Sequence, residues 1–308
     1  MNVLVLGGSG FLGTAVCMRL LEQAHAVRMF CRCGAEFEHP LSGHVDWVCG
    51  NFSEEMDLSG VLIGMDAVVH LISTTVPKSS ADNPLFDVQS NLCSTLRLLA
   101  QLKSSRVSKL VFISSGGTIY GRSQYLPIDE RHPTEPMVSY GIVKLAIEKY
   151  LRLYREVTDA SVTVLRVANV YGERQTVKSG QGAVGAFLHQ ALNGLPIEIW
   201  GDGSIVRDYI YVGDVARAIV QALENQSAHS VFNIGSGCGL SLNQVVDEIE
   251  GALVTKLTKI YRPTRSIDVP VNVLDCTLAA NELGWQPMVG FPEGIRRTIE
   301  WLRSNTKV

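Results

Sequence analysis

Three glycines near the N-terminus constrain the fold more than any other feature of the chain. They stand in a G-x-x-G-x-x-G motif, at Gly7, Gly10 and Gly13. The apolar run Val3–Leu6 precedes them, and apolar residues recur at helical spacing over Phe11–Leu21. A strand, a tight turn and a helix in this order are the first half of a βαβ unit. Glycines there let the backbone approach a phosphate at the positive end of the helix, so the motif predicts a dinucleotide site. The predicted site includes the two residues that open the helix, Phe11 and Leu12.

Apolar runs and helical stretches continue to alternate through the first half of the chain. The expected strands are Val27–Phe30, Ala67–Leu71, Leu110–Ile113 and Val162–Val167, and the expected helices between them include Leu92–Leu102 and Val143–Tyr154. This alternation predicts a parallel sheet that is covered by helices on both faces.

The pattern loosens after about Gly172. Beyond this point we expect three helices and one short strand, at Val184–Asn193, Val212–Glu224, Leu242–Leu253 and Val231–Ile234. The expected fold class is therefore α/β, with a Rossmann-like doubly wound parallel sheet in residues 1–171. Residues 172–308 are expected to form mainly a smaller C-terminal α/β substrate lobe, with some segments returning to the Rossmann body.

Charge and cysteine content narrow the range of partners. A net charge of −3 and 19% charged residues give no basis for binding nucleic acid or an acidic membrane. No apolar run reaches the roughly 18 residues of a membrane-spanning helix, and the N-terminus does not resemble a signal peptide. Seven scattered cysteines are typical of reduced thiols in a cytoplasmic protein, and their spacing predicts no metal site. We expect a cytoplasmic protein whose partners are small molecules.

The cofactor residue at the end of the second strand is unusual. An acidic residue about 20 residues after the glycines usually holds the ribose hydroxyls of NAD, but this segment contains Arg32 instead. A guanidinium can pair with the 2′-phosphate of NADP, although Arg32 can also stack on adenine. We therefore expect NAD(P), with NADP(H) somewhat favoured over NAD.

Tyr140 and Lys144 are candidate catalytic residues. Four positions apart on a helix, a phenol and an ammonium lie on one face. We expect Lys144, together with an oxidised nicotinamide, to lower the pKa of the phenol toward neutrality. Such a tyrosine can exchange a proton with a hydroxyl while a hydride moves, although exposed Tyr/Lys pairs also occur by chance. We also expect Tyr140 and Lys144 to contact the cofactor, together with the glycine motif.

Several blocks in a fixed order strengthen this interpretation. Ser114–Gly121 precedes Tyr140, and further blocks begin at Arg166, Gly201, Asn233 and Leu283. In this order the sequence resembles the extended short-chain dehydrogenase/reductases, particularly the NAD-dependent epimerase/dehydratase family typified by UDP-glucose 4-epimerase. The resemblance covers nearly the whole chain.

The resemblance implies roles for further residues. A hydroxyl after the strand contacts the reacting sugar oxygen, but its usual position is Gly116 here, which leaves Thr118 or Ser115, with Thr118 slightly favoured. An Asp that usually contacts adenine is replaced by Asn51. Further cofactor contacts are expected at Phe52 and Leu71. The expected substrate contacts are Asn169 at the diphosphate, Arg207 and Arg265 at the phosphates, and Asp268 at the ribose or a neighbouring arginine.

Three functions follow from these features. The first is a nucleotide-sugar 4-epimerase that works through a transient 4-keto sugar, with a nucleotide-diphosphate sugar as substrate. The second is an NADPH-dependent 4-ketoreductase of a 4-keto-6-deoxy nucleotide sugar, and the third is a non-catalytic NADP(H) sensor. Dehydration is disfavoured because Gly117 and Thr118 stand where the dehydratases have an Asp-Glu pair. By resemblance we also expect a homodimer, formed through a four-helix bundle of Leu92–Leu102 and Val143–Tyr154.

Overall fold

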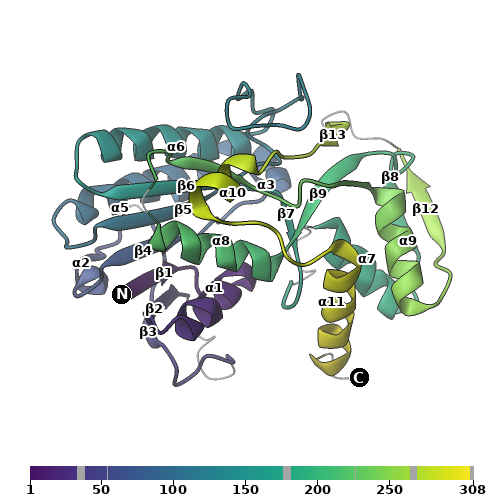
Figure 1. Cartoon of the computed structure of the whole chain (residues 1–308), viewed down its shortest axis with the longest axis horizontal. Helices are drawn as coiled ribbons and strands as arrows, with labels where there is room; N and C mark the ends of the chain where they lie inside the picture. Colours follow the sequence, from purple (N-terminus) through teal and green to yellow (C-terminus); the bar gives the residue numbers. More distant parts are fainter. Residues whose placement is uncertain (33–38, 54, 176–181, 226, 264–268, 306–308) are drawn as a thin grey trace.

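The computed structural model describes the chain except for residues 33–38, 54, 176–181, 226, 264–268 and 306–308. Its main body contains a seven-stranded sheet in which all neighbouring strands are parallel (Figure 1). In spatial order the strands are β10 (Val231–Ile234), β6 (Ser161–Val167), β5 (Lys109–Ser115), β4 (Ala67–His70), β1 (Asn2–Leu6), β2 (Ala26–Cys31) and β3 (Asp46–Cys49). The predicted Rossmann-like α/β fold is confirmed.

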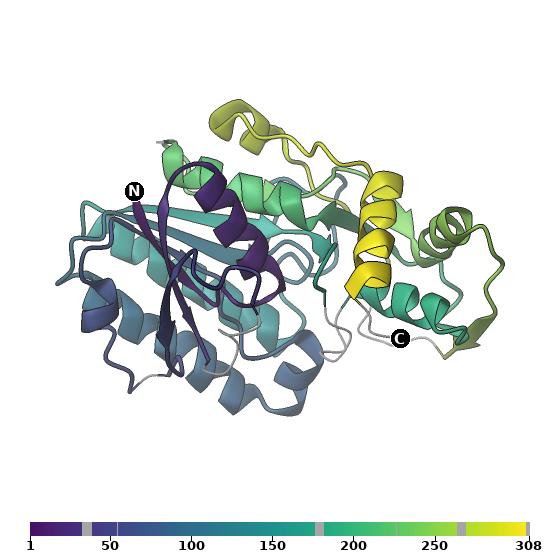
Figure 2. The ribbon, with the colours of Figure 1, turned by 90° about the horizontal axis from the view of Figure 1, so that it is seen from below.

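Helices cover both faces of this sheet, because successive side chains of each strand point to opposite faces. Val3 and Val5 of β1 belong to one hydrophobic core, and Leu4 and Leu6 belong to the other. Figure 2 shows the sheet between its two layers of helices. On the Val3 side lie α1 (Phe11–Glu22), α8 (Val212–Glu224) and α10 (Thr277–Leu283). On the Leu4 side lie α2 (Ser59–Leu62), α5 (Ser94–Leu102) and α6 (Ser139–Glu156).

The order of the sheet reverses beside β1. The chain continues from β1 to β2 on one side, and β4 lies on the other side. In open parallel sheets, ligands bind beyond the carboxyl ends of the strands at such a reversal. The glycine motif begins at this end of β1.

The lobe has a separate core and two small sheets. The four-stranded sheet contains β7 (Asn169–Tyr171), β9 (Val206–Tyr211), β11 (Gly239–Ser241) and β13 (Val271–Asn272), and the two-stranded sheet pairs β8 (Ile197–Trp200) with β12 (Lys259–Arg262). Around them lie α7 (Ala183–Leu192), α9 (Leu242–Leu253) and α11 (Phe291–Asn305). This core forms where the amphipathic helices bury their apolar faces against short strands.

Two elements that sequence analysis grouped with the lobe pattern lie in the main body. Helix α8 packs against α1, and β10 pairs with β6 at the edge of the main sheet. The apolar face of α8 explains its position, since Val215, Ile219 and Leu223 are fully buried against the sheet. The boundary between the predicted domains stays a prediction.

The expected helix Leu92–Leu102 corresponds to α5 and the end of a π-helical segment, η1 (Val88–Cys93). Two short helices precede this segment, α3 (Pro77–Asp82) and α4 (Pro84–Asp87). Wider turns of this kind occur often at functional sites. Among the helices of the described ranges, none is both long enough and apolar enough to span a bilayer.

Candidate active site

The glycine turn leaves the start of α1 open to an anion. Gly7 has a φ of +87°, which glycine adopts readily, and a Cβ on Gly13 would lie 2.2 Å from the carbonyl oxygen of Gly7. Gly10 caps α1 and has no side chain that could bond the first backbone N–H groups, and the first turn has no acidic residue. N–H groups at the positive end of a helix that lacks such a capping side chain suit a pyrophosphate. The structure therefore fits the predicted dinucleotide.

Phe11 and Leu12 lie at the boundary between body and lobe. Both side chains are half-buried and pack against the hydrophobic core of the lobe. The open end of α1 is therefore next to the lobe, and a ligand bound there is within reach of both parts.

The other predicted cofactor residues follow the carboxyl ends of neighbouring strands. Arg32 comes after β2 and Asn51 after β3, and both are exposed. Leu71 directly follows β4 and is half-buried. Phe52 is buried, with its ring centre 5.2 Å from that of His70. These positions line the edge of the sheet where the glycine turn lies, although Phe52 also packs within the core.

Tyr140 and Lys144 lie on the first turns of α6. The Lys144 Nζ atom is 5.7 Å from the centre of the Tyr140 ring and donates a 2.9 Å hydrogen bond to the carbonyl oxygen of Ile113. It also lies 4.7 Å from the centre of the Phe112 ring. Lys144 thus ties α6 to β5 near the carboxyl end of the strand, and the predicted pair comes together.

Burial changes the expected charge state of this pair. Removal from water raises the pKa of Tyr140, and the nearby Asp87 carboxylate raises it further, while a hydrogen bond with Ser73 lowers it. Burial lowers the pKa of Lys144 to about 8, against the opposing effects of Asp87 and Glu148. In the protein alone desolvation is the largest effect on Tyr140, so the expected lowering of its pKa by Lys144 and an oxidised nicotinamide stays a prediction for the cofactor-bound protein.

The candidate hydroxyls lie on the turn after β5. The Oγ1 atom of Thr118 is buried and has no hydrogen-bond partner within the described chain, whereas Ser115 is half-buried at the end of the strand. A Cβ on Gly141 would lie 2.7 Å from the carbonyl oxygen of Thr118. The turn therefore packs against α6 directly beside Tyr140. Since buried hydroxyls normally have a hydrogen-bond partner, this one is a candidate for contact with a ligand.

A buried carboxylate that sequence analysis missed lies close to Tyr140 and Lys144. Asp87, at the end of α4, is fully buried and accepts a 2.8 Å hydrogen bond from the hydroxyl of Ser139. Asn91 also donates to it, one helical turn later. The sequence signal was two small polar residues four positions apart in a segment of helical pattern, which is too common to be informative alone.

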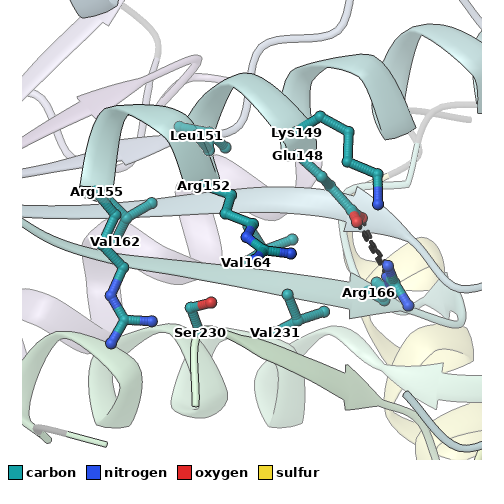
Figure 3. Close-up of a pocket in the computed structure, with 10 residues that line it drawn as sticks. All are labelled: Glu148, Lys149, Leu151, Arg152, Arg155, Val162, Val164, Arg166, Ser230 and Val231. Atoms are coloured by element: carbon teal, nitrogen blue, oxygen red, sulfur yellow. Dashed lines mark hydrogen bonds and ion pairs between the residues drawn. The ribbon is translucent and has the colours of Figure 1, made fainter. Parts of the chain in front are cut away.

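Residues of three sequence blocks form one buried network. Arg166 contacts Glu148 at 2.7 Å and donates to the hydroxyl of Tyr120, which in turn donates to Asn233. Figure 3 shows the Glu148–Arg166 ion pair beside a cleft of about 110 Å³ between α6, β6 and β10. This network joins the loop after β5 to α6 and to the edge of the sheet. Tyr120, Arg166 and Asn233 thus serve to hold the fold together.

Two predicted substrate residues lie in the four-stranded sheet of the lobe. Asn169 on β7 donates a 3.0 Å hydrogen bond to the carbonyl oxygen of Asp208, and Arg207 on β9 donates to the carbonyl oxygens of Val206 and Val269. The other two predicted residues, Arg265 and Asp268, lie outside the described residues.

Known proteins resemble this chain over almost its whole length. Residues 3–235 match the model of the NAD dependent epimerase/dehydratase family. The chain is 34% identical to a UDP-glucose 4-epimerase of Mycolicibacterium smegmatis, with 100% of both chains covered. It is 31% identical to a dTDP-4-dehydro-6-deoxyglucose reductase of Escherichia coli, with 98% of both covered.

Solved structures give the same result. A UDP-glucose 4-epimerase of Thermotoga maritima with UDP-glucose superimposes with a TM-score of 0.92 at 33% identity, covering 99% of both chains. A Thermus thermophilus UDP-glucose 4-epimerase in complex with NAD gives a TM-score of 0.90 at 33% identity, covering 99% of this chain and 100% of the other.

Proposed function

The chain belongs to the NAD dependent epimerase/dehydratase family, and from this membership we propose that it is a nucleotide-sugar 4-epimerase. The observation that carries the proposal is the Tyr140/Lys144 pair, held at the same edge of the sheet as a glycine turn that fits a pyrophosphate. A sugar bound between them meets a proton-transfer group and a dinucleotide together.

The proposed cofactor is NAD(P), held by Gly7, Gly10 and Gly13 at the start of α1. When bound, its oxidised nicotinamide supplies a hydride acceptor that returns the hydride, and it adds a positive charge to the site. The exposed positions of Arg32 and Asn51 suit contacts with the adenosine half. We propose that Arg32 favours NADP(H), because a guanidinium matches a 2′-phosphate in charge and shape.

Tyr140 is the proposed general base and acid. It removes the proton from the C4 hydroxyl of the sugar as the 4-keto sugar forms, and it returns the proton when the other epimer forms. Because burial raises the pKa of Tyr140 in the protein alone, its ionisation needs the positive charge brought by the cofactor. The Thr118 hydroxyl, or that of Ser115, is proposed to bond the reacting oxygen.

The lobe is proposed to bind the nucleotide diphosphate. Arginines are well suited to a diphosphate because their fork of donors matches two oxygens at once. Arg207, with Asn169 on the neighbouring strand, lies in the described part of the lobe, and the proposal extends to Arg265 and Asp268 by resemblance.

A second candidate function is 4-ketoreduction. It is favoured by Arg32 in place of the usual ribose-binding acid, and by the similarity to the Escherichia coli reductase. In that reaction Tyr140 donates its proton to the new hydroxyl, and NADPH is consumed in each turnover.

We also propose a cytoplasmic homodimer. On α6 the side chains of Ile142, Tyr150 and Leu153 are exposed and share one side of the helix, and Leu85 and Phe86 on α4 are exposed as well. Apolar groups gathered on one helix surface are typical of an interface, and a second copy of the chain fits the expected helix bundle. No disulfide joins the six cysteines that the structure describes, as suits a reducing compartment.

The test combines cofactor release with two assays. The purified protein is denatured and any released dinucleotide is identified, and separate samples receive UDP-glucose or a 4-keto-6-deoxy nucleotide sugar with NADPH. Retained dinucleotide and formation of the 4-epimer, followed by proton NMR, support the proposed function. NADPH oxidation that depends on the keto sugar, without epimer formation, supports the reductase instead.

A further inference from the structure

The buried carboxylate of Asp87 is held by neutral donors. Its Oδ1 atom accepts hydrogen bonds of 2.7 Å from the Thr75 hydroxyl and 3.0 Å from the Asn91 amide, and its Oδ2 atom accepts the bond from Ser139. Asp87 is 0% exposed, and within the described chain none of the donors that contact it is a cation. Because its partners are neutral, the negative charge of a buried carboxylate of this kind acts on the ionisable groups around it.

This carboxylate lies at the start of the helix that carries the Tyr/Lys pair. Ser139 is the first residue of α6, and the backbone N–H of Tyr140 donates a 3.1 Å hydrogen bond to the hydroxyl of Ser80 on α3. The first turn of α6 is therefore attached to both α3 and α4. An anion at this end of an 18-residue helix also interacts favourably with the helix dipole.

Other charges near the pair are already compensated. Glu148 forms an ion pair with Arg166, and His70 on β4 is kept neutral because burial lowers its pKa to about 3. Among the titratable groups that face Lys144 in the described structure, namely Asp87, Glu148 and His70, only Asp87 is an anion without a cationic partner in contact.

We propose that Asp87 is a positioning residue, which fixes the first turn of α6 through Ser139 and supplies a negative charge that acts on both Tyr140 and Lys144. This inference rests on the proposed function, since it concerns the same proton-transfer pair. The negative charge opposes ionisation of Tyr140 and favours the charged form of Lys144. It therefore keeps the pair in its Tyr-OH and Lys-NH₃⁺ state until the cofactor adds its positive charge.

The proposal predicts a change that a merely structural residue does not cause. Replacing Asp87 by Asn keeps the shape and removes the charge, so the pKa values of both Tyr140 and Lys144 fall. Both limbs of the pH profile of kcat then move to lower pH, by on the order of one unit. Damage to the fold lowers the height of the profile and leaves its limbs in place.

The first experiment titrates Tyr140 directly in the cofactor-loaded protein. Tyrosinate absorption is recorded against pH for the wild type and Asp87→Asn, and each is corrected with the matching Tyr140→Phe protein. We expect Tyr140 to ionise about one pH unit lower in Asp87→Asn. The control is Asp82→Asn, which removes an exposed carboxylate on α3 and should leave the titration unchanged.

The outcomes separate this proposal from the proposed function. Equal titration of Tyr140 in wild type and Asp87→Asn overturns the inference, whether or not the protein epimerises sugars, because no sugar is present. If Asp87→Asn does not fold, Ser139→Ala tests the positioning role: faster amide exchange of Tyr140 and Gly141 in that variant supports the role, and unchanged exchange overturns it.

Discussion

Leu274 occupies the space beside Gly116, so that a Cβ on Gly116 would lie 2.6 Å from Cδ1 of Leu274. The carbonyl oxygen of Arg166 would lie 3.1 Å from that Cβ. A side chain at Gly116, the position of the catalytic hydroxyl according to the family resemblance, would therefore collide with Leu274, which follows β13. We propose that the hydroxyl comes instead from Thr118 or Ser115 on the same turn.

Restoring a serine at this position should destabilise the protein. We expect Gly116→Ser to lower the free energy of unfolding by about 1–3 kcal/mol, because the new side chain overpacks against Leu274. In a double-mutant cycle measured by urea unfolding, Leu274→Ala should relieve part of this cost, so the double variant is more stable than the sum of the single changes implies. Additive effects contradict the predicted contact.

Loss of the Tyr140 hydroxyl should affect turnover and little else. We expect Tyr140→Phe to lower kcat by roughly a thousandfold, since a positioned acid or base contributes about 10²–10⁴. Dinucleotide affinity, measured by fluorescence titration, and the midpoint of thermal unfolding should stay near their wild-type values. Residual turnover close to that of the wild type refutes the assigned role.

The buried His70 should make the protein less stable in acid. Burial lowers its pKa from 6.5 to about 3, so the unfolded chain binds a proton that the folded chain does not. The stability contributed by neutral His70 is complete above pH 6.5 and is lost as the pH falls toward 3. Between pH 6.5 and 5 the loss is about 1.5 kcal/mol.

Urea unfolding at several pH values checks this effect. His70→Leu should remove the additional acid sensitivity whatever its own stability, whereas replacement of the exposed His44 by Leu should keep it. The same pH dependence in wild type and His70→Leu means that another group is responsible.

Charge at Arg32 should determine cofactor preference. Arg32→Asp places a carboxylate beside the 2′-phosphate, and we expect NADPH affinity to fall by 10-fold or more, on the order of 1.4 kcal/mol, while NADH affinity rises. Calorimetric titration with both dinucleotides measures the change. The matched control is Arg106→Asp. Arg106 is exposed and precedes the amino end of β5, whereas Arg32 follows the carboxyl end of β2. Unchanged affinities for both dinucleotides would falsify the role of Arg32.

A charge on the exposed side of α6 should separate the proposed dimer. We expect Leu153→Glu to convert the dimer into a monomer, since burial of an unpaired carboxylate at an interface is costly. Analytical ultracentrifugation measures the mass in solution. Val254→Glu changes an apolar residue that is 91% exposed at the end of α9, and it should leave the assembly intact. A wild-type protein that is already monomeric rules out the homodimer.

The sequence alone determined the features that depend on neighbouring residues. The turn at Gly7 and Gly13 could be predicted because the spacing of glycines after a strand fixes the local backbone. Tyr140 and Lys144 could be placed on one face because helical geometry relates positions four apart. The order of strands and helices likewise determined the parallel sheet, since such crossovers follow one rule of handedness.

Tertiary structure alone decided the environment of these residues. Asp87 meets Ser139 across 52 positions of sequence, and Leu274, which lies in the core of the main body, reaches Gly116 from a segment much later in the sequence. The raised pKa of Tyr140 in the protein alone could not be predicted from the sequence, because desolvation depends on everything packed around the phenol, including segments that no local pattern relates to it. Local spacing selects which groups can react, and long-range packing sets their charge state.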